Sequence, residues 1–381
     1  MKKNKIIYLS HSDIRFDSRI LKEMQSAHDS GNLVQGIGIN SREKFVKATE
    51  IEHLLISSIS LFSRKLVFLP KSIRHFFSMC ELTIKMGIFA MRTKPDLIHC
   101  NDTVVLPVAV IVKILAGAKL VYDAHELESK KNGVSRFLGF FILFTEKVLW
   151  HFVDGLIVVG PSIQRWYLEN IGEKASVVVL NSPVIKKVLS NKTNYLREKF
   201  KIPDHSKIFI YIGLFTNGRG IDLTIDALNK TDASVSVVFL GYGEKANILE
   251  QLSAKHYNVH VHEAVPHDQV VSIAKSADFG LCLIENISLS DYFSLPNKLF
   301  EYAFAEIPVL ASNFPDISFL VNKHKLGLCV SLDVDSIAQG FEKICNNELH
   351  FSIDAKELVE YGWNAQANKL TWLYSELLKS K

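Results

Sequence analysis

The chain has 381 residues, of which 48% are hydrophobic and 22% are charged. This composition is typical of an ordered globular protein and excludes the disordered, collagen-like and low-complexity classes. The length is sufficient for two domains of about 150–200 residues each. The formal net charge is only +4, but residues 1–190 carry +9 and residues 191–381 carry −5.

The basic first half indicates contact with an anionic partner, which is either nucleic acid or a membrane surface. Its basic residues between positions 64 and 94 are interleaved with an apolar series rather than with loop glycines. This pattern favours the membrane. We therefore expect no binding of nucleic acid.

Signal peptides, membrane spans and metal or redox sites are not predicted. The apolar run Ile6–Leu9 is too short for a signal peptide, and residues 104–121 are interrupted by Lys113, Gly117 and Lys119. No two cysteines have C-x-x-C spacing, so we predict a reduced protein in the cytoplasm, with no metal and no cofactor beyond its co-substrate. The cysteines are Cys80, Cys100, Cys282, Cys329 and Cys345.

β-rich apolar runs alternate with helical patterns along the whole chain. In the first half we predict strands near residues 6, 33, 97, 119, 156 and 177, whereas the segment near 40–60 has no clear pattern. This alternation predicts an α/β fold with a doubly wound domain over residues 1–183. A second such domain is predicted over 184–360, and residues 361–381 have helical spacing. A cleft between two domains is the default position for a ligand.

Two segments of the first half are rich in phenylalanine. Residues 61–77 and residues 137–144 each contain four phenylalanines. Helical spacing places an apolar face beside a cationic one in the first segment, which is typical of helices at a membrane interface. In the second, the rings are more than one packed face can bury, and an exposed remainder would suit either an apolar acceptor or a membrane. We predict peripheral membrane contact through both, and a core helix with a solvated basic face over residues 78–92.

Polar residues follow two of the predicted strands in the first half. Residues 99–102 read H-C-N-D and residues 123–126 read D-A-H-E, so both strands deliver polar groups to one edge of a parallel sheet. His125 is the candidate functional residue, and a capping or solvent-exposed histidine is the alternative. Asp17 and Arg19, at the start of the first helix, are either an ordinary pair in its first turn or substrate ligands.

Glycines surround an arginine in the first loop of the second half. The loop 214–220 follows a predicted strand ending at Gly213 and contains Gly218 and Arg219. Glycine allows the backbone to approach a phosphate, and a guanidinium binds phosphate through two hydrogen bonds. The next strand ends at Gly241, which again permits a nucleotide to lie close to the backbone.

The stretch 291–312, D-Y-F-S-L-P-N-K-L-F-E-Y-A-F-A-E-I-P-V-L-A-S, predicts a loop, a helix starting near Pro296 and a short strand. We expect Ser294 and Asn297 to cap nearby backbone donors. The first helical turn and the charge of Lys298 suit a diphosphate. Glu301, about one turn later, is placed to accept hydrogen bonds from two adjacent hydroxyls, such as those of a ribose. The alternative is a packing helix with a solvated Glu301.

The sequence P-N-K-L-F-E-Y followed by P-V-L-A-S resembles the signature of the family 4 glycosyltransferases. These are retaining enzymes of the two-Rossmann-domain architecture called GT-B. The resemblance implies that Glu301 binds the ribose of a nucleotide and that the loop amides around Ser294 and Leu295 contact sugar and phosphate. It also implies that the last helix packs back on the first domain, which binds the acceptor.

Further segments carry the same resemblance. V-Y-D-A-H-E-L implies that His125 lies beside the transferred sugar, and H-E-A-V-P implies that the nucleotide base lies near Val265. The chain departs from the family pattern at Phe293, where a second glutamate is usual, and at Leu214, where a first arginine is usual. We expect Asp291, or the backbone of residues 294–295, to replace the missing glutamate.

These observations predict a glycosyltransferase that moves a hexose, with retention, from a nucleotide diphosphate sugar to a glycan or lipid-linked glycan, in cell-surface polysaccharide synthesis. Catalysis would rest on His125 and on stabilisation of the leaving diphosphate by Arg219, Lys298 and helix-end amides. Two alternatives stay open: a nucleotide-sugar epimerase or hydrolase, and a non-catalytic nucleotide-binding subunit. A dinucleotide dehydrogenase is disfavoured, because neither half has G-x-G-x-x-G after its first strand.

Overall fold

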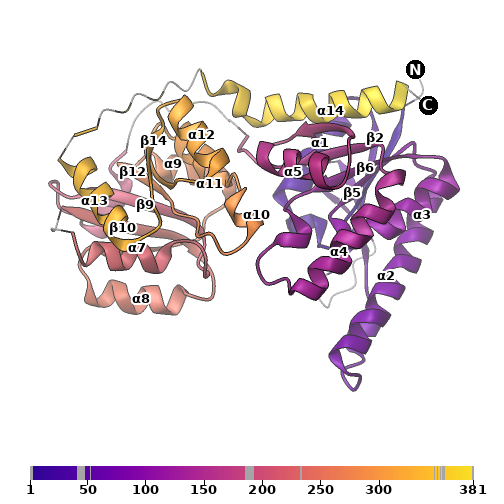
Figure 1. The fold of residues 1–381 in the computed structure, drawn as a ribbon, viewed down its shortest axis with the longest axis horizontal. Coiled ribbons are helices and arrows are strands. Elements are labelled where there is room, and N and C mark those ends of the chain that lie inside the picture. The colour runs from indigo at the N-terminus through magenta and orange to yellow at the C-terminus, as the bar shows by residue number, and fades with distance from the viewer. Residues whose placement is uncertain are drawn as a thin grey trace. The chain divides into compact units, whose positions relative to one another are not determined.

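The computed structural model describes residues 3–40, 48–51, 53–184, 193–231, 234–346, 348–349, 351, 353 and 357–379. Parts of the predicted linker and of the unassigned segment near 40–60 lie outside these residues. The chain divides into two compact units: the first comprises residues 1–179 and 366–381, and the second comprises residues 180–365. Each has a parallel or mostly parallel sheet with helices packed on it (Figure 1), which confirms the predicted class of two doubly wound Rossmann-like domains.

The first unit is built on sheet A. Within the described residues its strands are β1 (Lys5–Leu9), β2 (Leu33–Ile39), β3 (Ala48–Ile51), β4 (Leu54–Ile59), β5 (Leu97–Asn101), β6 (Lys119–Ala124), β7 (Gly155–Val158) and β8 (Ala175–Val178). Their order is β3-β4-β2-β1-β5-β6-β7-β8, and all neighbours are parallel except β3 and β4. The chain moves outward in opposite directions from β1 and from β5, so the crevice between their carboxyl ends is a topological switch point.

Successive residues along a strand of sheet A point to opposite faces of the sheet, and different helices cover the two faces. These are α1 (Ser18–Asp29), α2 (Lys71–Thr93), α3 (Leu106–Ala116), α4 (Arg136–Leu149), α5 (Pro161–Asn170) and α14 (Trp363–Lys379). The hydroxyl of Tyr8 in β1 lies 3.2 Å from the Glu23 carbonyl of α1 and 2.8 Å from the Tyr374 hydroxyl of α14. Tyr122 in β6 has the opposite phase and bonds Glu146 of α4. Therefore α1 and α14 cover one face of the sheet, and α4 covers the other.

None of the described helices combines the length and the apolar content needed to cross a membrane. The long apolar run of residues 104–121 is α3 followed by β6, as the interrupting lysines and glycine predicted.

The second unit is built on sheet B, whose described strands are all parallel. They are β9 (Lys207–Leu214), β10 (Val235–Tyr242), β11 (Val259–Glu263), β12 (Phe279–Cys282), β13 (Val309–Ser312) and β14 (Gly327–Val330). The order β11-β10-β9-β12-β13-β14 puts a second switch point between β9 and β12. The helices are α6 (Tyr195–Phe200), α7 (Ile221–Leu228), α8 (Ala246–Lys255), α9 (His267–Ala274), α10 (Leu289–Tyr292), α11 (Asn297–Phe304), α12 (Pro315–Lys323) and α13 (Val334–Cys345).

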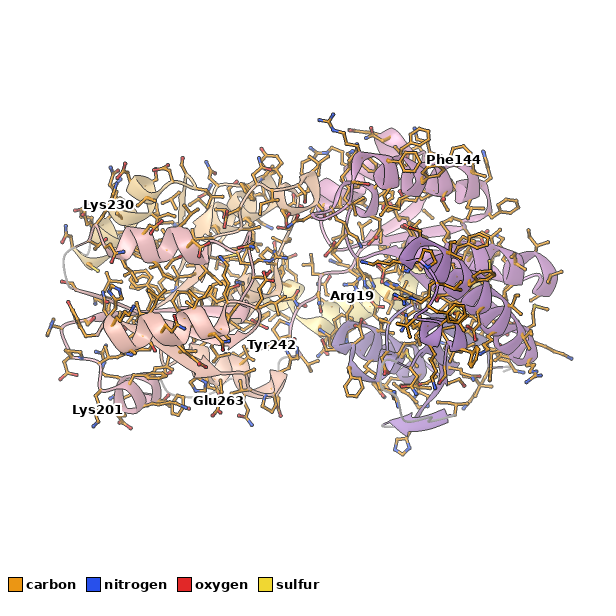
Figure 2. All side chains as sticks on the ribbon, turned by 90° about the horizontal axis from the view of Figure 1, so that it is seen from below. Arg19, Phe144, Lys201, Lys230, Tyr242 and Glu263 are labelled. Atoms are coloured by element: carbon orange, nitrogen blue, oxygen red, sulfur yellow. The ribbon has the colours of Figure 1, made fainter. Side chains whose placement is uncertain are left out.

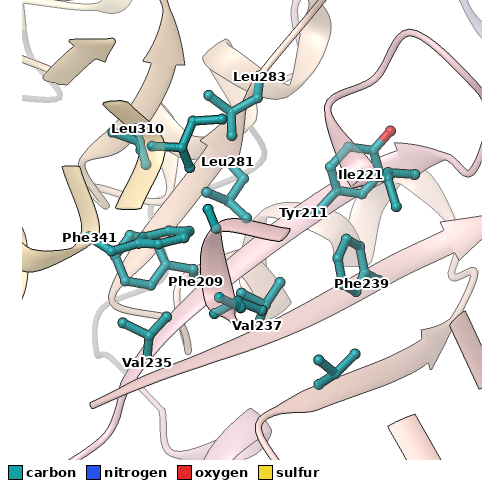
Figure 3. Close-up of a cluster of buried hydrophobic side chains, with 14 of the residues drawn as sticks. Phe209, Tyr211, Ile221, Val235, Val237, Phe239, Leu281, Leu283, Leu310 and Phe341 are labelled. Atoms are coloured by element: carbon teal, nitrogen blue, oxygen red, sulfur yellow. The ribbon is translucent and has the colours of Figure 1, made fainter. Parts of the chain in front are cut away.

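The core of the second unit is a cluster of buried aliphatic and aromatic side chains from sheet B and its helices (Figure 3). The rings of Phe209 in β9 and Phe341 in α13 meet edge to face, with centroids 4.7 Å apart, and both side chains are fully buried. Phe239 of β10 belongs to the same cluster. This core fixes the strands whose carboxyl ends form the switch point of the second unit.

Truncation of the core ring should destabilise the second unit. Phe341→Ala removes a buried ring and leaves a cavity, so we expect the free energy of unfolding to fall by about 3–5 kcal/mol. Urea denaturation followed by fluorescence measures this change. Phe319→Ala, on the solvent side of α12 where the ring is 65% exposed, is the matched control and should change stability by less than about 1 kcal/mol. Equal effects of the two variants would contradict the packing described.

Candidate functional site

Strands β9 and β10 each have a glycine next to their last residue, so no side chain covers the backbone at that position. Gly213 and Gly241 are register partners, with φ of +134° and +154°. A Cβ atom on Gly241 would lie 1.9 Å from the Gly213 carbonyl oxygen, so no other residue fits there without a backbone shift. The two strand ends thus present main chain rather than side chains, and Gly213 of β9 does so at the switch point of sheet B.

The loop after β9 places Arg219 beside this bare backbone. Gly218 and Gly220 flank the arginine with φ of +81° and +69°, and the Gly220 amide donates to Glu285 Oε1 at 3.1 Å. The guanidinium is about one third exposed, and its Nη1 lies 3.8 Å from Asp291 Oδ1. This distance is too long for a strong hydrogen bond, so the N–H groups of the guanidinium stay available to a ligand.

The first turn of α11 is open. Pro296 is the N-cap residue, and no side chain makes a capping hydrogen bond to this helix. The expectation that Ser294 and Asn297 cap it is therefore wrong for α11. The Ser294 hydroxyl is buried and has no hydrogen-bond partner among the described residues. The first-turn amides and this hydroxyl together form a donor set suited to an anion.

Lys298 is a buried cation without a hydrogen-bond acceptor among the described residues. The side chain is 8% exposed, and its ammonium lies 3.6 Å from the centroid of the Tyr211 ring. Burial lowers the pKa of Lys298 to about 7; Cys282 and Glu301 oppose the shift, whereas Arg219 adds to it. A Cβ atom on Gly213 would lie 3.6 Å from Nζ, so the ammonium lies beside the bare end of β9.

Tyr302 fixes the part of α11 that carries Lys298 and Glu301. Its hydroxyl donates to the carbonyls of Ile210 and Leu281, at 3.0 and 3.1 Å, and accepts from the Ile212 amide at 3.1 Å. These bonds tie the helix to β9 and β12. Glu301 is 7% exposed, one residue before this anchor.

The remaining predicted residues of the second unit occupy its loops. Leu295 and Asn297 are half-buried at the start of α11, and Val265 is half-buried in the loop between β11 and α9. Arg219 and Glu301 both affect the pKa of Lys298, in opposite directions. The sequence reasoning missed Tyr211, whose ring lies against the ammonium, because an aromatic residue in a buried strand has no distinctive spacing.

A second cluster lies at the carboxyl ends of the strands in sheet A, around Arg19 (Figure 2). Arg19 Nη2 lies 3.2 Å from both carboxylate oxygens of Asp123, Nε lies 3.0 Å from Glu23 Oε1, and Nη1 donates to the Val179 carbonyl at 2.9 Å. The side chain of Asp17 instead caps α1 by accepting from the amides of residues 19 and 20. Arg19 is therefore neither paired with the Asp17 side chain nor exposed to a substrate; it is the buried centre of an ion cluster.

His125 is held between two carboxylates at the edge of this cluster. Its Nε2 lies 3.1 Å from Asp123 Oδ2, and its Nδ1 lies 3.8 Å from Asp102 Oδ1. Burial alone would lower the pKa of His125, but Asp123 and Asp102 raise it to about 10. His125 is thus an imidazolium near neutral pH and acts as a hydrogen-bond donor rather than as a base.

Asp102 follows β5 in a strained conformation, with φ of +67°. This region is costly for a residue with a Cβ atom and is found mainly where a side chain must be held in place. Here it directs the carboxylate of Asp102 between His125 and His11, whose Nδ1 lies 3.6 Å away. The structure therefore confirms that the two strand ends bring residues 99–102 and 123–126 together.

His99 connects this cluster to the C-terminal helix. Its Nε2 faces oxygens of Asp123 at 3.2 Å and Glu23 at 3.4 Å, and its Nδ1 lies 2.5 Å from the Tyr374 hydroxyl. Burial lowers the pKa of His99, so the neutral ring donates from Nε2 and accepts from Tyr374. The sequence reasoning missed Glu23, although its spacing of four from Arg19 is a signal, and it missed Tyr374, which 275 residues separate from His99.

The ligand atoms of Glu23, His99 and Asp123 lie within 4.8 Å of one another, a spacing that would allow a metal ion. The guanidinium of Arg19, however, already donates to both oxygens of Asp123 and lies 3.0 Å from one oxygen of Glu23. A second cation would meet a positive charge at the same oxygens. The residues present therefore do not fit a metal ion.

Comparisons with known proteins relate this chain to glycosyltransferases. Residues 206–347 match the family model described as "Glycosyl transferases group 1". The chain is 24% identical over 218 residues to the O-antigen biosynthesis glycosyltransferase WclY of Escherichia coli, an alignment that covers 54% of this chain and 56% of that protein. The match thus spans about half the length of this curated relative, and it supports a glycosyltransferase family.

Solved structures share the two-domain fold over the whole chain. Sucrose-phosphate synthase from Thermosynechococcus elongatus has a TM-score of 0.80 at 16% identity, with 100% of both chains covered. Anabaena HepE in complex with UDP-glucose has a TM-score of 0.75 at 13% identity, with 98% of this chain and 100% of that chain covered. The fold is accordingly the GT-B architecture.

Removal of the buried ammonium should stabilise the unliganded protein. Below pH 7 Lys298 is charged in both folded and unfolded chains, so its desolvation cost is fully present, and the cost is lost between pH 7 and about 10.5. We expect Lys298→Met to raise the free energy of unfolding by roughly 2–5 kcal/mol at pH 6.5 and by much less near pH 10. Urea denaturation across this pH range measures the difference. A variant that is less stable than the wild type at pH 6.5 would contradict the description of Lys298.

Loss of the Tyr374 hydroxyl should destabilise the first unit. Tyr374→Phe leaves Nδ1 of His99 buried without its donor, so we expect the free energy of unfolding to fall by about 1–3 kcal/mol. Trp372→Phe is the matched control, since Trp372 is 55% exposed on the same helix. Chemical denaturation of both variants checks the prediction. If Tyr374→Phe leaves the free energy of unfolding unchanged, the hydrogen bond between Tyr374 of α14 and His99 does not form in solution.

Proposed function

We propose that the protein is a retaining glycosyltransferase that transfers a hexose from a nucleotide diphosphate sugar to a glycan or lipid-linked glycan acceptor in cell-surface polysaccharide synthesis. The observation that carries the proposal is the unpaired, buried ammonium of Lys298 beside Arg219 and the uncapped first turn of α11. A buried charge without an acceptor is costly, and a diphosphate supplies the missing counter-charge.

Each group then has a role. Arg219 and Lys298 bind the diphosphate and stabilise the charge that develops on it as the glycosidic bond breaks. Glu301 accepts hydrogen bonds from the ribose hydroxyls, and the bare backbone at Gly213 and Gly241 allows close approach. No step in this scheme uses a metal ion or a further cofactor.

Asp291 takes the place of the glutamate that the resemblance expects at position 293. Its carboxylate lies 3.8 Å from Arg219 and accepts from the Ser288 hydroxyl, so it is held beside the phosphate-binding guanidinium. Sugar hydroxyls are hydrogen-bond donors that such a carboxylate accepts. His125, as an imidazolium, donates a hydrogen bond to an oxygen of the transferred sugar.

Two substitutions test the donor site, one of a carboxylate and one of a guanidinium. We expect nucleotide diphosphates and their sugars to raise the melting temperature of the wild type, with UDP and UDP-glucose as the first probes. Glu301→Ala and Arg219→Ala should each abolish this shift and leave the unliganded melting temperature nearly unchanged. Glu250→Ala and Arg165→Ala, at exposed positions, are the matched controls and should keep the shift.

Product analysis tests the reaction itself. Transfer with the anomeric configuration of the donor retained, read from NMR coupling constants, supports the proposal. Rapid turnover without an acceptor would favour an epimerase or hydrolase. Tight donor binding without turnover across a broad acceptor panel would favour the non-catalytic subunit, for which the absent glutamate and arginine at Phe293 and Leu214 are the motivating features.

A further inference from the structure

Helix α4 has the reverse of the usual surface pattern. Its buried residues are Gly139 and Glu146, whereas Phe137, Phe140 and Phe144 are 75%, 63% and 55% exposed. The exposed rings contact one another, with Phe140 and Phe144 stacked at 6.4 Å. Figure 2 shows Phe144 on the outer side of its unit. An ordinary surface helix buries its apolar face, so these rings are not explained by the core.

The inner face of α4 is polar and closely packed. Glu146 Oε1 accepts from the hydroxyls of Thr103, Tyr122 and Tyr167, at 3.1, 2.7 and 2.7 Å. A Cβ atom on Gly139 would lie 2.5 Å from the carbonyl oxygen of Ser129. These contacts fix which face of the helix points outward, so the phenylalanines cannot turn inward without breaking them.

The start of α2 adds a second set of exposed rings. Ser78 is the first buried residue of α2, and residues 71–77 before it are exposed except for a half-buried Arg74. Phe76 is 65% exposed, and Phe68, in the turn before the helix, is 80% exposed. Two helical turns without a buried residue gain nothing from the core of this unit and need another apolar environment.

The three helices α2, α3 and α4 lie beside one another. α2 packs on α3, and α3 packs on α4. Ile114 and Leu115 of α3 are also exposed, at 59% and 65%. We call Phe68, Phe76, Phe77, Phe137, Phe140 and Phe144 the phenylalanine surface. The exposed apolar residues that are normal on a protein surface are scattered singly, whereas these six rings are grouped on two segments of one unit.

Charge decides which partner fits the phenylalanine surface. The sequence has no acidic residue between Glu52 and Glu81, where it has four lysines and arginines. It also has no acidic residue between Glu128 and Glu146, where it has three lysines and arginines. An apolar protein partner does not require a rim of one sign, whereas exposed aromatic rings with only cations around them match the headgroups and acyl boundary of an anionic bilayer.

We propose that the phenylalanine surface inserts into the interface of a membrane that contains anionic lipid. The rings enter the acyl boundary, and Arg64, Lys65 and Arg74 contact lipid phosphates. This partner is argued from the surface alone and does not depend on the proposed reaction.

The same surface borders the polar strand ends of sheet A. Helix α4 packs on Glu128–Lys130, which directly follow the segment that holds His125, and a Cβ atom on Gly139 would lie 2.5 Å from the Ser129 carbonyl oxygen. An acceptor anchored in the bilayer would therefore present its polar head to the edge that holds His125. This step names the acceptor class as an amphiphile, and it rests on the proposed function.

Vesicle binding of the full chain tests the docking. We expect co-sedimentation with vesicles of phosphatidylcholine containing about one third phosphatidylglycerol, and at least about tenfold weaker partition at about 1 M than at about 0.1 M salt. Phe68→Ser with Phe76→Ser, and separately Phe140→Ser with Phe144→Ser, should each weaken partition at least about tenfold without lowering the melting temperature. Phe319→Ser, equally exposed in the second unit, should leave partition unchanged.

Three outcomes would overturn the docking: no binding of the wild type to anionic vesicles, an equal loss in Phe319→Ser, or a wild-type dimer that Phe140→Ser with Phe144→Ser converts to monomer. Arg64→Gln with Arg74→Gln should remove most of the salt dependence. Transfer to an acceptor anchored in the vesicles should fall in the serine variants while transfer to a water-soluble acceptor does not. Absence of any transfer, with vesicle binding intact, would overturn the proposed reaction and leave the docking standing.

Discussion

Both units bury a cation at the carboxyl ends of the strands of their sheet. The two cations differ in how they are paired, and this difference separates a structural cluster from a candidate ligand site. Arg19 has two carboxylates and a carbonyl within hydrogen-bond distance, so its charge is neutralised inside the protein. Lys298 has a ring against it and no acceptor among the described residues. Since an unpaired buried charge is costly, the first arrangement is structural, whereas the second leaves the Lys298 ammonium available to the anion proposed above.

The fold supplies the geometry for this contrast. In a doubly wound sheet the strand order reverses at one point, and the loops on either side separate to leave a crevice. In sheet B, Gly213 lies near the end of β9 on one side of this reversal and beside Gly241 of β10, and Tyr302 ties α11 to β9 and β12, the strands on both sides of the reversal. The position of Lys298 is therefore set by rigid elements, although the loop before it has no capping side chain to hold it.

Strand placement was predictable because parallel strands buried on both faces are short β-branched runs, as in β9 and β10. The hairpin of β3 and β4 was not, since Ser57 and Ser58 interrupt the apolar pattern and are nevertheless buried. Within the candidate site, the charge type of Arg219, Lys298 and Glu301 followed from the motif, whereas the missing partner of Lys298 depends on tertiary packing. The side-chain partner of Arg19 was not predictable because Asp123 is 104 residues away, whereas Asp17, two residues away, accepts only from the Arg19 amide among these groups.

The net charge of each half of the chain and the local charge at its sites favour different partners. The second half carries −5, so it does not attract a nucleotide by its overall field; only the local pair of Arg219 and Lys298 can. In the first half, Arg64 and Lys65 beside the phenylalanine surface are exposed, whereas Arg19 at the polar strand ends is buried and paired with Asp123. Exposed cations beside exposed rings are accessible to an extended anionic partner, which is the basis of the docking proposed above. A buried cation that is already paired is not accessible to such a partner.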